Sequence, residues 1–484
     1  MGNIVIPTHS EGELVTEIHY DFGLHLISQH LFHGGKTLLD FGLPTPVLSW
    51  STSTQNPLLN EATSYCPDEQ TAIYQSLSAN LNLKQLDYYQ QICFTIDNNQ
   101  SKQFFLQGQA GTGKTYLYCC LSSYARSKGK VVLCVASTGI AAQLLPGGQT
   151  SHSRFKIPFE LHEDSVCSMT WNSPLGQLLL STALIIWDEV PTQHKKCFEA
   201  VNRSLNDLFN SPSDTIFGGI TVLLGGDFAQ ILPVVRHGNR QSTVNACIQH
   251  SSIWPKLQQL RLTDNMRVSP DPENVHFVDF LARMSYDQSL YGNMHLPPYI
   301  QRVTTVEELC FNVFPPALLQ EAAEQHDSFM GKAILAFRND TVNDFNSILI
   351  QSLSGEMHTF HSADTVDVNT NATGQKQLPA EYLQSLSPAS LPPAELNLKV
   401  GAPVILIRNI CTKEGLCNGT RLRITQLGRF CIEASILNGP FAGRVHLLSR
   451  MKLQTLKDEF PFALTRKQFP IRLSFAMRIN KSQG

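Results

Sequence analysis

Short apolar runs alternate with amphipathic segments between about residue 103 and residue 265. The runs are Phe104–Gln107, Val131–Ala136, Ala183–Trp187 and Ile220–Leu224. Continuous apolar runs are typical of strands buried on both faces, and strands that alternate with helices form parallel sheets. The pattern therefore predicts an α/β region built on a parallel sheet. A helix over Leu81–Ile96 is predicted just before it.

A second alternating block follows. It has an apolar run at Ala333–Phe337, a helical segment at Asp340–Leu353 and a strand at Val400–Ile407. Residues 355–398 are rich in Pro, Ser and Asn, which predicts a surface loop. Residues 410–450 contain short strand-like segments separated by the turns Asn418-Gly419 and Asn438-Gly439, which predict a small β insertion.

Composition narrows the class of protein. With 42% hydrophobic and 16% charged residues, the 484-residue chain can bury a large core and is not a disordered polymer. No apolar run approaches the roughly 18 residues that a membrane helix needs, and the first residues lack a secretory pattern. The 12 Cys include no CxxC pair, which favours reduced thiols over a disulfide framework.

The charge is divided unevenly along the chain. The whole sequence has a net charge of −3, but residues 399–484 hold 15 basic and 4 acidic residues, a net of +11, which leaves −14 for the rest. Such asymmetry is typical of a polyanion-binding surface confined to one domain. A solvated basic face is the other interpretation, and charge alone does not decide between them.

A phosphate-binding motif stands between a predicted strand and a predicted helix. The segment Gly108-Gln109-Ala110-Gly111-Thr112-Gly113-Lys114-Thr115 fits G-x-x-x-x-G-K-[ST] in full, after Phe104–Gln107 and before the helical Tyr116–Ser127. Glycines let backbone N–H groups face phosphate oxygens at a helix N-terminus. Lys114 would reach the β and γ phosphates, and the Thr115 hydroxyl would hold Mg²⁺.

Two further strand ends carry polar groups. The run Ala183–Trp187 leads into Asp188 and Glu189, where Asp188 suits a second Mg²⁺ ligand and Glu189 a base for the attacking water. The run Ile220–Leu224 leads through Gly225-Gly226-Asp227 to Gln230, an uncharged group that can sense the γ-phosphate. Together with the phosphate motif, these ends predict nucleotide hydrolysis.

With these three strand ends, the sequence resembles the PIF-type DNA helicases, the 5′-to-3′ branch of superfamily one. It is most similar to the form found in Helitron rolling-circle transposon proteins. The resemblance spans roughly residues 80–484. It rests on Gly108–Thr115, Ala136–Ala142, Thr150–Pro158, Trp187–Glu189, Gly226–Pro233, Leu262–Arg267, Leu398–Val404, Gly415–Leu422 and Phe469–Gly484.

The resemblance implies an α/β fold with two RecA-like P-loop NTPase lobes, parallel sheets and a small β-rich insertion in the second lobe. Residues 1–60 would be a leader or linker. Residues 61–265 would form the first lobe, with a small wedge-type insertion at about 155–180. Residues 266–484 would form the second lobe, incomplete at its C-terminus, with the β insertion at about 410–450. ATP and Mg²⁺ would lie between the lobes, and single-stranded DNA would cross them.

The resemblance also implies roles for single residues. Gln85, with Gln70 as a second candidate, would read adenine, and Arg267 would be an arginine finger from the second lobe. The predicted nucleotide-binding residues are Gln85, Gly108, Gly111, Thr112, Gly113, Lys114 and Thr115, and the predicted catalytic residues are Lys114, Asp188, Glu189, Gln230 and Arg267, with Thr115 and Asp188 on Mg²⁺. The predicted DNA-binding residues are Ser137, Thr138, His152, Phe155, Asn418, Gly419, Thr420, Lys481, Ser482 and Gln483. His152 and Phe155 would be stacking platforms for bases, although Phe155 taken by itself is more typical of a core aromatic residue.

The implied activity is an ATP-dependent DNA helicase that moves 5′-to-3′ on single-stranded DNA and opens duplex junctions. The implied processes are DNA repair, recombination, telomere maintenance or Helitron transposition, by a nuclear protein that is expected to be a monomer. The sequence ends at Gly484, before the segment that supplies a second arginine finger in the family, and Arg478 and Asn480 depart from the usual residues. A truncated remnant that binds ATP or DNA without unwinding is therefore an alternative. Another P-loop enzyme, such as a small-molecule kinase, would give no reason for Gln230 or for the basic C-terminal region.

Overall fold

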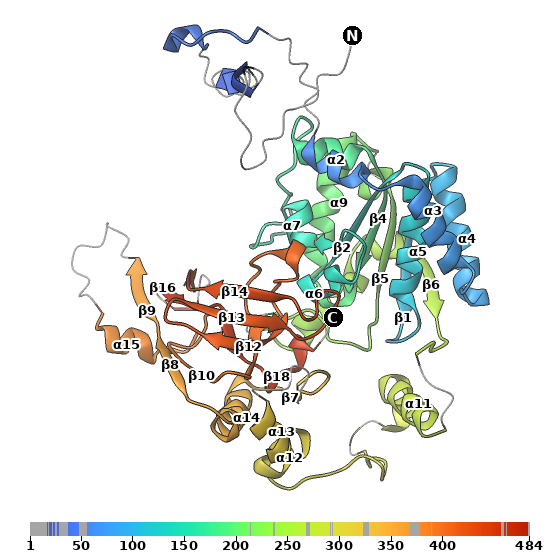
Figure 1. Ribbon diagram of the computed structural model, residues 1–484. Coiled ribbons are helices and arrows are strands. Elements are labelled where there is room, and N and C mark those ends of the chain that lie inside the picture. Colours follow the sequence, from blue (N-terminus) through green and yellow to red (C-terminus); the bar gives the residue numbers. More distant parts are fainter. Residues whose placement is uncertain are drawn as a thin grey trace. The chain divides into compact units, whose positions relative to one another are not determined.

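The computed structural model divides the chain into two compact units, Met1–Glu61 and Ala62–Gly484 (Figure 1). It describes residues 17, 19–21, 23–24, 27–28, 37–47, 56–212, 214–235, 238–267, 272–290, 292, 294–322, 329–367, 378–388, 390–455, 459–460 and 462–482. In the first unit, Leu39–Phe41 form a short 3₁₀ helix that ends at Gly42, and α2 (Pro57–Thr63) crosses the boundary between the units. The candidate sites all lie in the second unit.

A six-stranded parallel sheet organises the N-terminal half of the second unit. Its strands follow the order β3-β2-β4-β5-β1-β6. The bounds are β1 Gln103–Gly108, β2 Val131–Ala136, β3 Gln149–Thr150, β4 Thr182–Asp188, β5 Thr221–Gly226 and β6 Gln258–Leu262. The four predicted apolar runs are confirmed as β1, β2, β4 and β5. These central strands are almost wholly buried, whereas β6 exposes polar side chains as an edge strand does.

Helices cover both faces of this sheet (Figure 1). Helices α3 (Pro67–Ser78), α4 (Leu83–Asp97) and α5 (Lys114–Ser127) share one core cluster with alternate residues of the strands. On the other face Trp187 of β4 packs between Phe155 of α7 (Ser151–Phe155) and Phe198 of α9 (Lys195–Phe209). The shorter helices are α6 (Gly139–Gln143), α8 (Pro174–Leu180) and α10 (Arg240–Ala246). Among the described residues, no helix is both long and apolar enough to cross a bilayer.

The C-terminal half has its own core and is dominated by antiparallel pairing. Helices α11 (Pro272–Tyr286), α12 (Val306–Val313), α13 (Pro316–Glu321) and α14 (Asn339–Ser352) accompany a parallel pair, β7 (Ile334–Ala336) and β18 (Ala476–Arg478). A five-stranded antiparallel sheet has the order β14-β13-β12-β11-β17. Its bounds are β11 Pro403–Leu406, β12 Arg421–Leu427, β13 Cys431–Ile436, β14 Val445–Ser449 and β17 Ile471–Leu473. Phe314, Phe329 and Phe475 meet edge to face in the core of this half.

The prediction of a surface loop over residues 355–398 is wrong. Strand β8 (His358–His361) pairs with β10 (Glu395–Leu398), and β9 (Ala363–Asp367) pairs with β16 (Ala463–Gln468), which also pairs with β15 (Met451–Gln454). Helix α15 (Ala380–Ser385) lies between β9 and β10 in sequence. The strands are short, and β9 finds its partner about a hundred residues later, so local composition does not reveal it. The α/β class is confirmed, but the β-rich part is larger than the predicted 410–450. All 12 Cys are free thiols, as predicted.

A buried ion pair joins the segments of the three-stranded sheet. The side chain of Arg466 on β16 is fully buried and donates to both carboxylate oxygens of Asp364 on β9, at 2.7–3.0 Å. Its remaining N–H groups donate to the backbone oxygens of Pro392, Leu383 and Leu386. Because each nitrogen of the guanidinium has at least one acceptor, the pair offsets the cost of burying two charges and ties β9, α15 and β16 together.

Replacing Asp364 with Ala should leave the Arg466 charge buried without its counter-ion. We expect the free energy of unfolding of this sheet to fall by about 3–5 kcal/mol. Hydrogen–deuterium exchange of the β9 and β16 amides measures the loss locally, which is preferable in a chain with more than one core.

The exposed Asp344→Ala on α14 is the control, and we expect it to leave exchange unchanged. The double replacement Asp364→Leu with Arg466→Met should cost less than Asp364→Ala alone, because it leaves no unpaired charge. Equal protection in Asp364→Ala and the natural chain would contradict a structural role for the pair.

Candidate functional site

The phosphate-binding loop lies between β1 and α5, as the sequence predicts. Gly111 and Gly113 adopt φ angles of 85° and 82°, in the left-handed region that favours glycine. The Lys114 side chain is 9% exposed, and its ammonium donates to the backbone oxygens of Gly108 at 2.6 Å and Gln109 at 3.4 Å. The Thr112 hydroxyl donates to Gln109 at 2.8 Å. The loop therefore curls around the Lys114 ammonium and keeps this charge beside the first turn of α5.

Gln85 supports this loop instead of facing a pocket. Its side-chain N–H donates to the backbone oxygen of Thr112 at 3.0 Å, and its side-chain oxygen accepts from the backbone N–H of Asn82 at 3.0 Å. The second contact belongs to the capping box that starts α4. Both amide atoms are therefore engaged within the chain. These two bonds use one N–H group and one oxygen lone pair of the amide, so the predicted adenine contact stays a prediction.

Two carboxylates meet the loop because the strand order places the carboxyl ends of β1, β4 and β5 at one edge of the sheet. Asp188 is buried, accepts a hydrogen bond from the Tyr118 hydroxyl at 3.3 Å, and has its pKa raised by burial. Burial, and then the charge of Asp188, raises the pKa of Glu189 to about 7. Glu189 has a left-handed backbone (φ 54°), and its Oε2 atom has no hydrogen-bond partner among the described residues. Two desolvated carboxylates beside one anion-binding loop are a site suited to a cation.

One pocket of about 630 Å³ collects all five predicted catalytic residues, Lys114, Asp188, Glu189, Gln230 and Arg267. Gly111, Gly113 and Thr115 line it as well, whereas Gly108, Thr112 and Gln85 are not among its lining residues. A volume of this size lies within the range of cofactor sites. The pocket therefore combines phosphate donors, two acids, an amide and a guanidinium.

Arg267 does not come from the second lobe. It follows β6 directly, and its neighbours bind the phosphate loop: the Met266 N–H donates to the Gly111 oxygen at 2.8 Å, and the Asn265 side chain donates to Ala110 at 3.2 Å. The Arg267 N–H in turn donates to the Asn265 side chain at 3.0 Å. The predicted delivery of Arg267 by the second lobe is therefore wrong, because this segment is fastened to the loop. Among the lining residues, Ser482 alone belongs to the C-terminal half.

A second pocket, of about 250 Å³, contains most of the predicted DNA-binding residues. It is lined from the N-terminal half by Ser137, Thr138 and His152, and from the C-terminal half by Asn418, Gly419 and Lys481. Burial lowers the pKa of His152, so its ring is more readily neutral than a free imidazole. The Lys481 ammonium donates to the Asn418 side chain at 2.8 Å. Polar groups from both halves and the Lys481 ammonium thus line one groove, which we call the interlobe groove.

The prediction for Phe155 as a stacking platform is wrong. Its ring is fully buried, with its centroid 5.1 Å from that of Trp187, and it fills the core beneath α7. Thr420 is buried too, and its hydroxyl donates to the Gly415 oxygen and accepts from the Cys417 N–H, so it holds the loop. Ser482 lines the nucleotide pocket rather than the interlobe groove, and Gln483 lies outside the described residues.

Sequence reasoning missed two features of the groove. The first is Phe159, which is 97% exposed and lines a further pocket of about 550 Å³ that shares Ser137, Thr138 and His152 with the interlobe groove. The second is a group of cations around Lys481. Desolvation of the Lys481 ammonium, and then the charges of Arg472, Arg408 and Arg478, lower its pKa, although the residue as a whole is exposed. The excess of basic residues after Lys399 is the signal that pointed to this group, without giving its position.

Two family models and several curated helicases match parts of this chain. The family model described as PIF1-like helicase matches residues 80–285, and that of the DNA helicase Pif1 2B domain matches residues 381–427. The ATP-dependent DNA helicase Pif1 of Psychrobacter sp. (strain PRwf-1) is 30% identical over 322 residues, which cover 66% of this chain and 43% of that protein. The ATP-dependent DNA helicase PIF1 of Mus musculus is 26% identical over 396 residues, which cover 80% of this chain and 52% of that protein. The chain thus spans about half the length of these relatives.

Solved structures share the fold. A Bacteroides Pif1 bound to ssDNA has a TM-score of 0.54 at 23% identity, with 81% of this chain and 83% of that chain covered. The Pif1 helicase from Candida albicans has a TM-score of 0.55 at 22% identity, with 84% and 86% covered. These likenesses show the fold alone. The two family models and the relative that is 30% identical show that the chain belongs to the PIF1-like helicase family.

Proposed function

We propose that this chain is an ATP-dependent DNA helicase that moves along single-stranded DNA by repeated hydrolysis of ATP. The observation that carries the proposal is the pairing of two sites in one unit. One pocket gathers a phosphate loop, two acids, an amide and a guanidinium. Beside it lies a groove lined with polar groups from both halves of the unit and with the Lys481 ammonium. Such a pairing suits an enzyme that converts nucleotide hydrolysis into movement on a polyanion.

At the nucleotide pocket each residue has a distinct task. The loop N–H groups and Lys114 bind phosphate oxygens, and Arg267 stabilises the charge that develops on the transferred phosphoryl group. Glu189, with an unpartnered carboxylate oxygen, orients the attacking water and accepts its proton. Gln230 follows β5 and can contact the γ-phosphate without adding charge.

The donor set also fits Mg²⁺. Thr115 supplies a hydroxyl and Asp188 a carboxylate, which are the oxygen ligands that this ion takes, and both line the same pocket. The buried acids are a second reason, since a cation would favour their charged forms over the protonated forms that burial favours. When bound, Mg²⁺ would neutralise charge on the phosphates. Tyr118 would keep the Asp188 carboxylate in place.

At the interlobe groove the chemistry suits a nucleic-acid backbone. Hydroxyls of Ser137 and Thr138, the Asn418 amide and the Lys481 ammonium are groups that commonly contact phosphates. His152 and the exposed Phe159 offer ring faces to unpaired bases, in place of the buried Phe155.

The relatives support the same ligands. One structure is of the Bacteroides Pif1 helicase in complex with ADP-AlF3 and ssDNA, so that protein binds both ligand classes together. For this chain, 5′-to-3′ polarity, action on duplex junctions, nuclear localisation and roles in repair, recombination, telomere maintenance or Helitron transposition belong to the proposal. They are supported by likeness to the family.

Replacing Lys114 with Ala tests the nucleotide site. We expect ATP hydrolysis stimulated by single-stranded DNA to fall by about 10²-fold or more, since the charge that faces the phosphates is lost. The measurement is the ATPase rate with and without single-stranded DNA, together with displacement of a strand from a forked duplex.

Lys128→Ala is the matched control at the C-terminal cap of the same helix, because Lys128 pairs with Asp97 on the surface. It should keep the natural rate. If the natural chain binds ATP and DNA but neither hydrolyses nor unwinds, the helicase proposal fails and the non-catalytic remnant replaces it.

Replacing Arg267 with Ala should lower kcat by about 10³-fold while ATP binding changes little, because a guanidinium on the transferring phosphoryl group acts mainly in the transition state. Steady-state kinetics and equilibrium binding of a fluorescent nucleotide separate the two quantities. Arg283→Ala, which removes an exposed i,i+4 ion pair with Asp287, is the control. An unchanged kcat in Arg267→Ala would show that the Arg267 guanidinium does not act on the transferred phosphoryl group.

Replacing Lys481 with Ala should weaken binding of single-stranded DNA for all sequences alike. The slope of log affinity against log salt should become shallower by about one unit, since one phosphate contact is lost. Fluorescence anisotropy at several salt concentrations measures both. Lys467→Ala is the control, because Lys467 is exposed on β16 and does not line the groove. Equal effects of both variants would reduce the groove to a general basic surface.

A further inference from the structure

Helix α6 lies between the nucleotide pocket and the interlobe groove. Ala141, and Leu144 at its C-terminal end, line the nucleotide pocket, whereas Gly139 and Ile140 line the groove. Thr138, another groove residue, caps the helix by accepting from the Ala141 N–H at 3.3 Å. One turn of helix therefore borders both sites. A shift of its axis would move lining residues of the nucleotide pocket and of the interlobe groove together.

The same helix contacts the C-terminal half through a close fit. The Gln143 side chain donates to the Cys417 sulfur at 2.9 Å. A Cβ atom on Gly139 would come within 2.8 Å of the Cys417 Cβ, closer than such atoms approach in proteins. In the reverse direction, a Cβ atom on Gly419 would come within 2.6 Å of the Ile140 side chain. The glycine of each half thus leaves room for a side chain of the other half. We call the set of Gly139, Ile140, Gln143, Cys417 and Gly419 the glycine contact.

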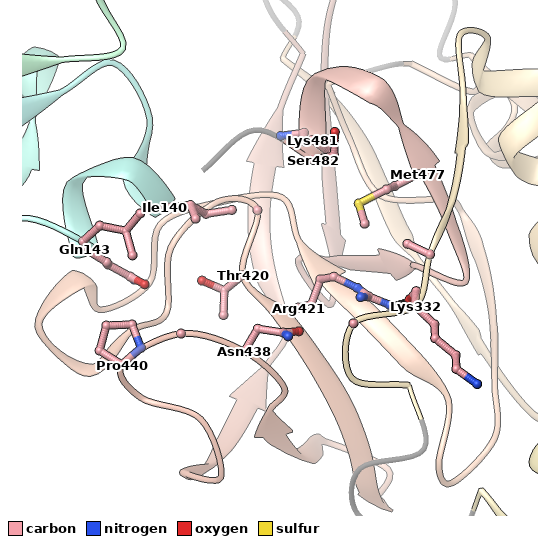
Figure 2. Close-up of a pocket in the computed structure, with 15 residues that line it drawn as sticks. Ile140, Gln143, Lys332, Thr420, Arg421, Asn438, Pro440, Met477, Lys481 and Ser482 are labelled. Carbon is pink, nitrogen blue, oxygen red and sulfur yellow. Dashed lines mark hydrogen bonds between the residues drawn. The ribbon is translucent and has the colours of Figure 1, made fainter. Parts of the chain in front are cut away.

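Beside this contact lies a cavity of about 360 Å³ that both halves line. Figure 2 shows Ile140 and Gln143 extending from α6 toward the loops that carry Thr420 and Pro440. The cavity shares Leu144 and Ser482 with the nucleotide pocket, and Ile140, Gly419 and Lys481 with the interlobe groove. Because this cavity adjoins the glycine contact, few other atoms join the two halves beside α6. The distance between the halves at this point therefore depends on the atoms of the glycine contact.

We propose that the glycine contact positions the loop that carries Asn418 and Gly419, and that it thereby couples the nucleotide pocket to the interlobe groove. Cys417 is followed directly by Asn418 and Gly419, which line the groove. The packing of Cys417 against Gly139 therefore fixes the positions of these two residues. When nucleotide draws the halves together, α6 transmits the movement to Asn418 and Gly419 through the packing of Gly139 against Cys417. The proposal rests on the proposed function and assigns Gly139, Gln143 and Cys417 as positioning residues.

The test is Gly139→Ala, which puts a methyl group against Cys417. The measured quantity is the ratio of Kd values for a fluorescent single strand without and with ADP, aluminium fluoride and Mg²⁺. We expect this ratio to fall about fivefold or more toward unity, because the coupling is lost. The Kd for nucleotide alone should change by less than about twofold, since Gly139 does not line that pocket.

Cys417→Gly in the Gly139→Ala background removes the opposing Cβ atom, and with it the sulfur that accepts from Gln143. We therefore expect it to restore the ratio to the value measured in Gln143→Ala, which a general loss of stability would not do. Gln143→Ala adds no atoms, and we expect it to lower the ratio by less than Gly139→Ala does, through loss of its bond to Cys417 alone. Gly23→Ala is the control, because its methyl group would meet nothing within 4 Å and its φ lies outside the left-handed region. It should keep the ratio.

The two levels of the proposal fail differently. If the natural chain binds no nucleotide or no single strand, the proposed function fails. If it binds both, and nucleotide either leaves its affinity for DNA unchanged or shifts it equally in Gly139→Ala, only the glycine contact is refuted. A ratio that is lost in Gly139→Ala but not recovered with Cys417→Gly also refutes it.

Discussion

The site depends on the parallel order of the first sheet. In a parallel sheet all strands end at the same edge, so the segments after β1, β4 and β5 must meet there. These segments supply a phosphate loop, two carboxylates and Gln230. The cost of this arrangement is electrostatic: Asp188 is buried, Glu189 beside it is partly buried, and the pKa of each carboxyl is raised. Lys114 relieves part of that repulsion, and a bound cation would relieve more.

The phosphate loop and the strand ends could be predicted because their evidence is local. A run of apolar residues, a turn of glycines and a lysine occur within a dozen positions, and strand order brings the rest together. Phe155 shows the limit of such reasoning. It stands in the family segment expected to touch DNA, yet it closes a short helix whose buried side faces Trp187. Phe159, beyond a proline and outside any helical period, is the exposed ring.

The C-terminal half was harder to predict for a different reason. Its strands are short and pair across long stretches of sequence, as β9 does with β16, so neither composition nor period marks them. The ion pair of Asp364 and Arg466 appears in the sequence only as two charges about a hundred residues apart. The likeness to Helitron proteins and the predicted truncation rest on residue patterns alone, and they stay predictions.

The position of Arg267 changes how closure of the lobes must be understood. The sequence placed this guanidinium on the moving lobe, where closing the cleft would complete the active site. In the structure its neighbours bind the phosphate loop, so Arg267 stays with the nucleotide pocket whatever the C-terminal half does. Nucleotide can then influence the second lobe only through elements that touch both. Two such elements are Ser482, which lines the nucleotide pocket, and α6, which carries the glycine contact. Since α6 also borders the groove, it offers a physical route from phosphate to DNA.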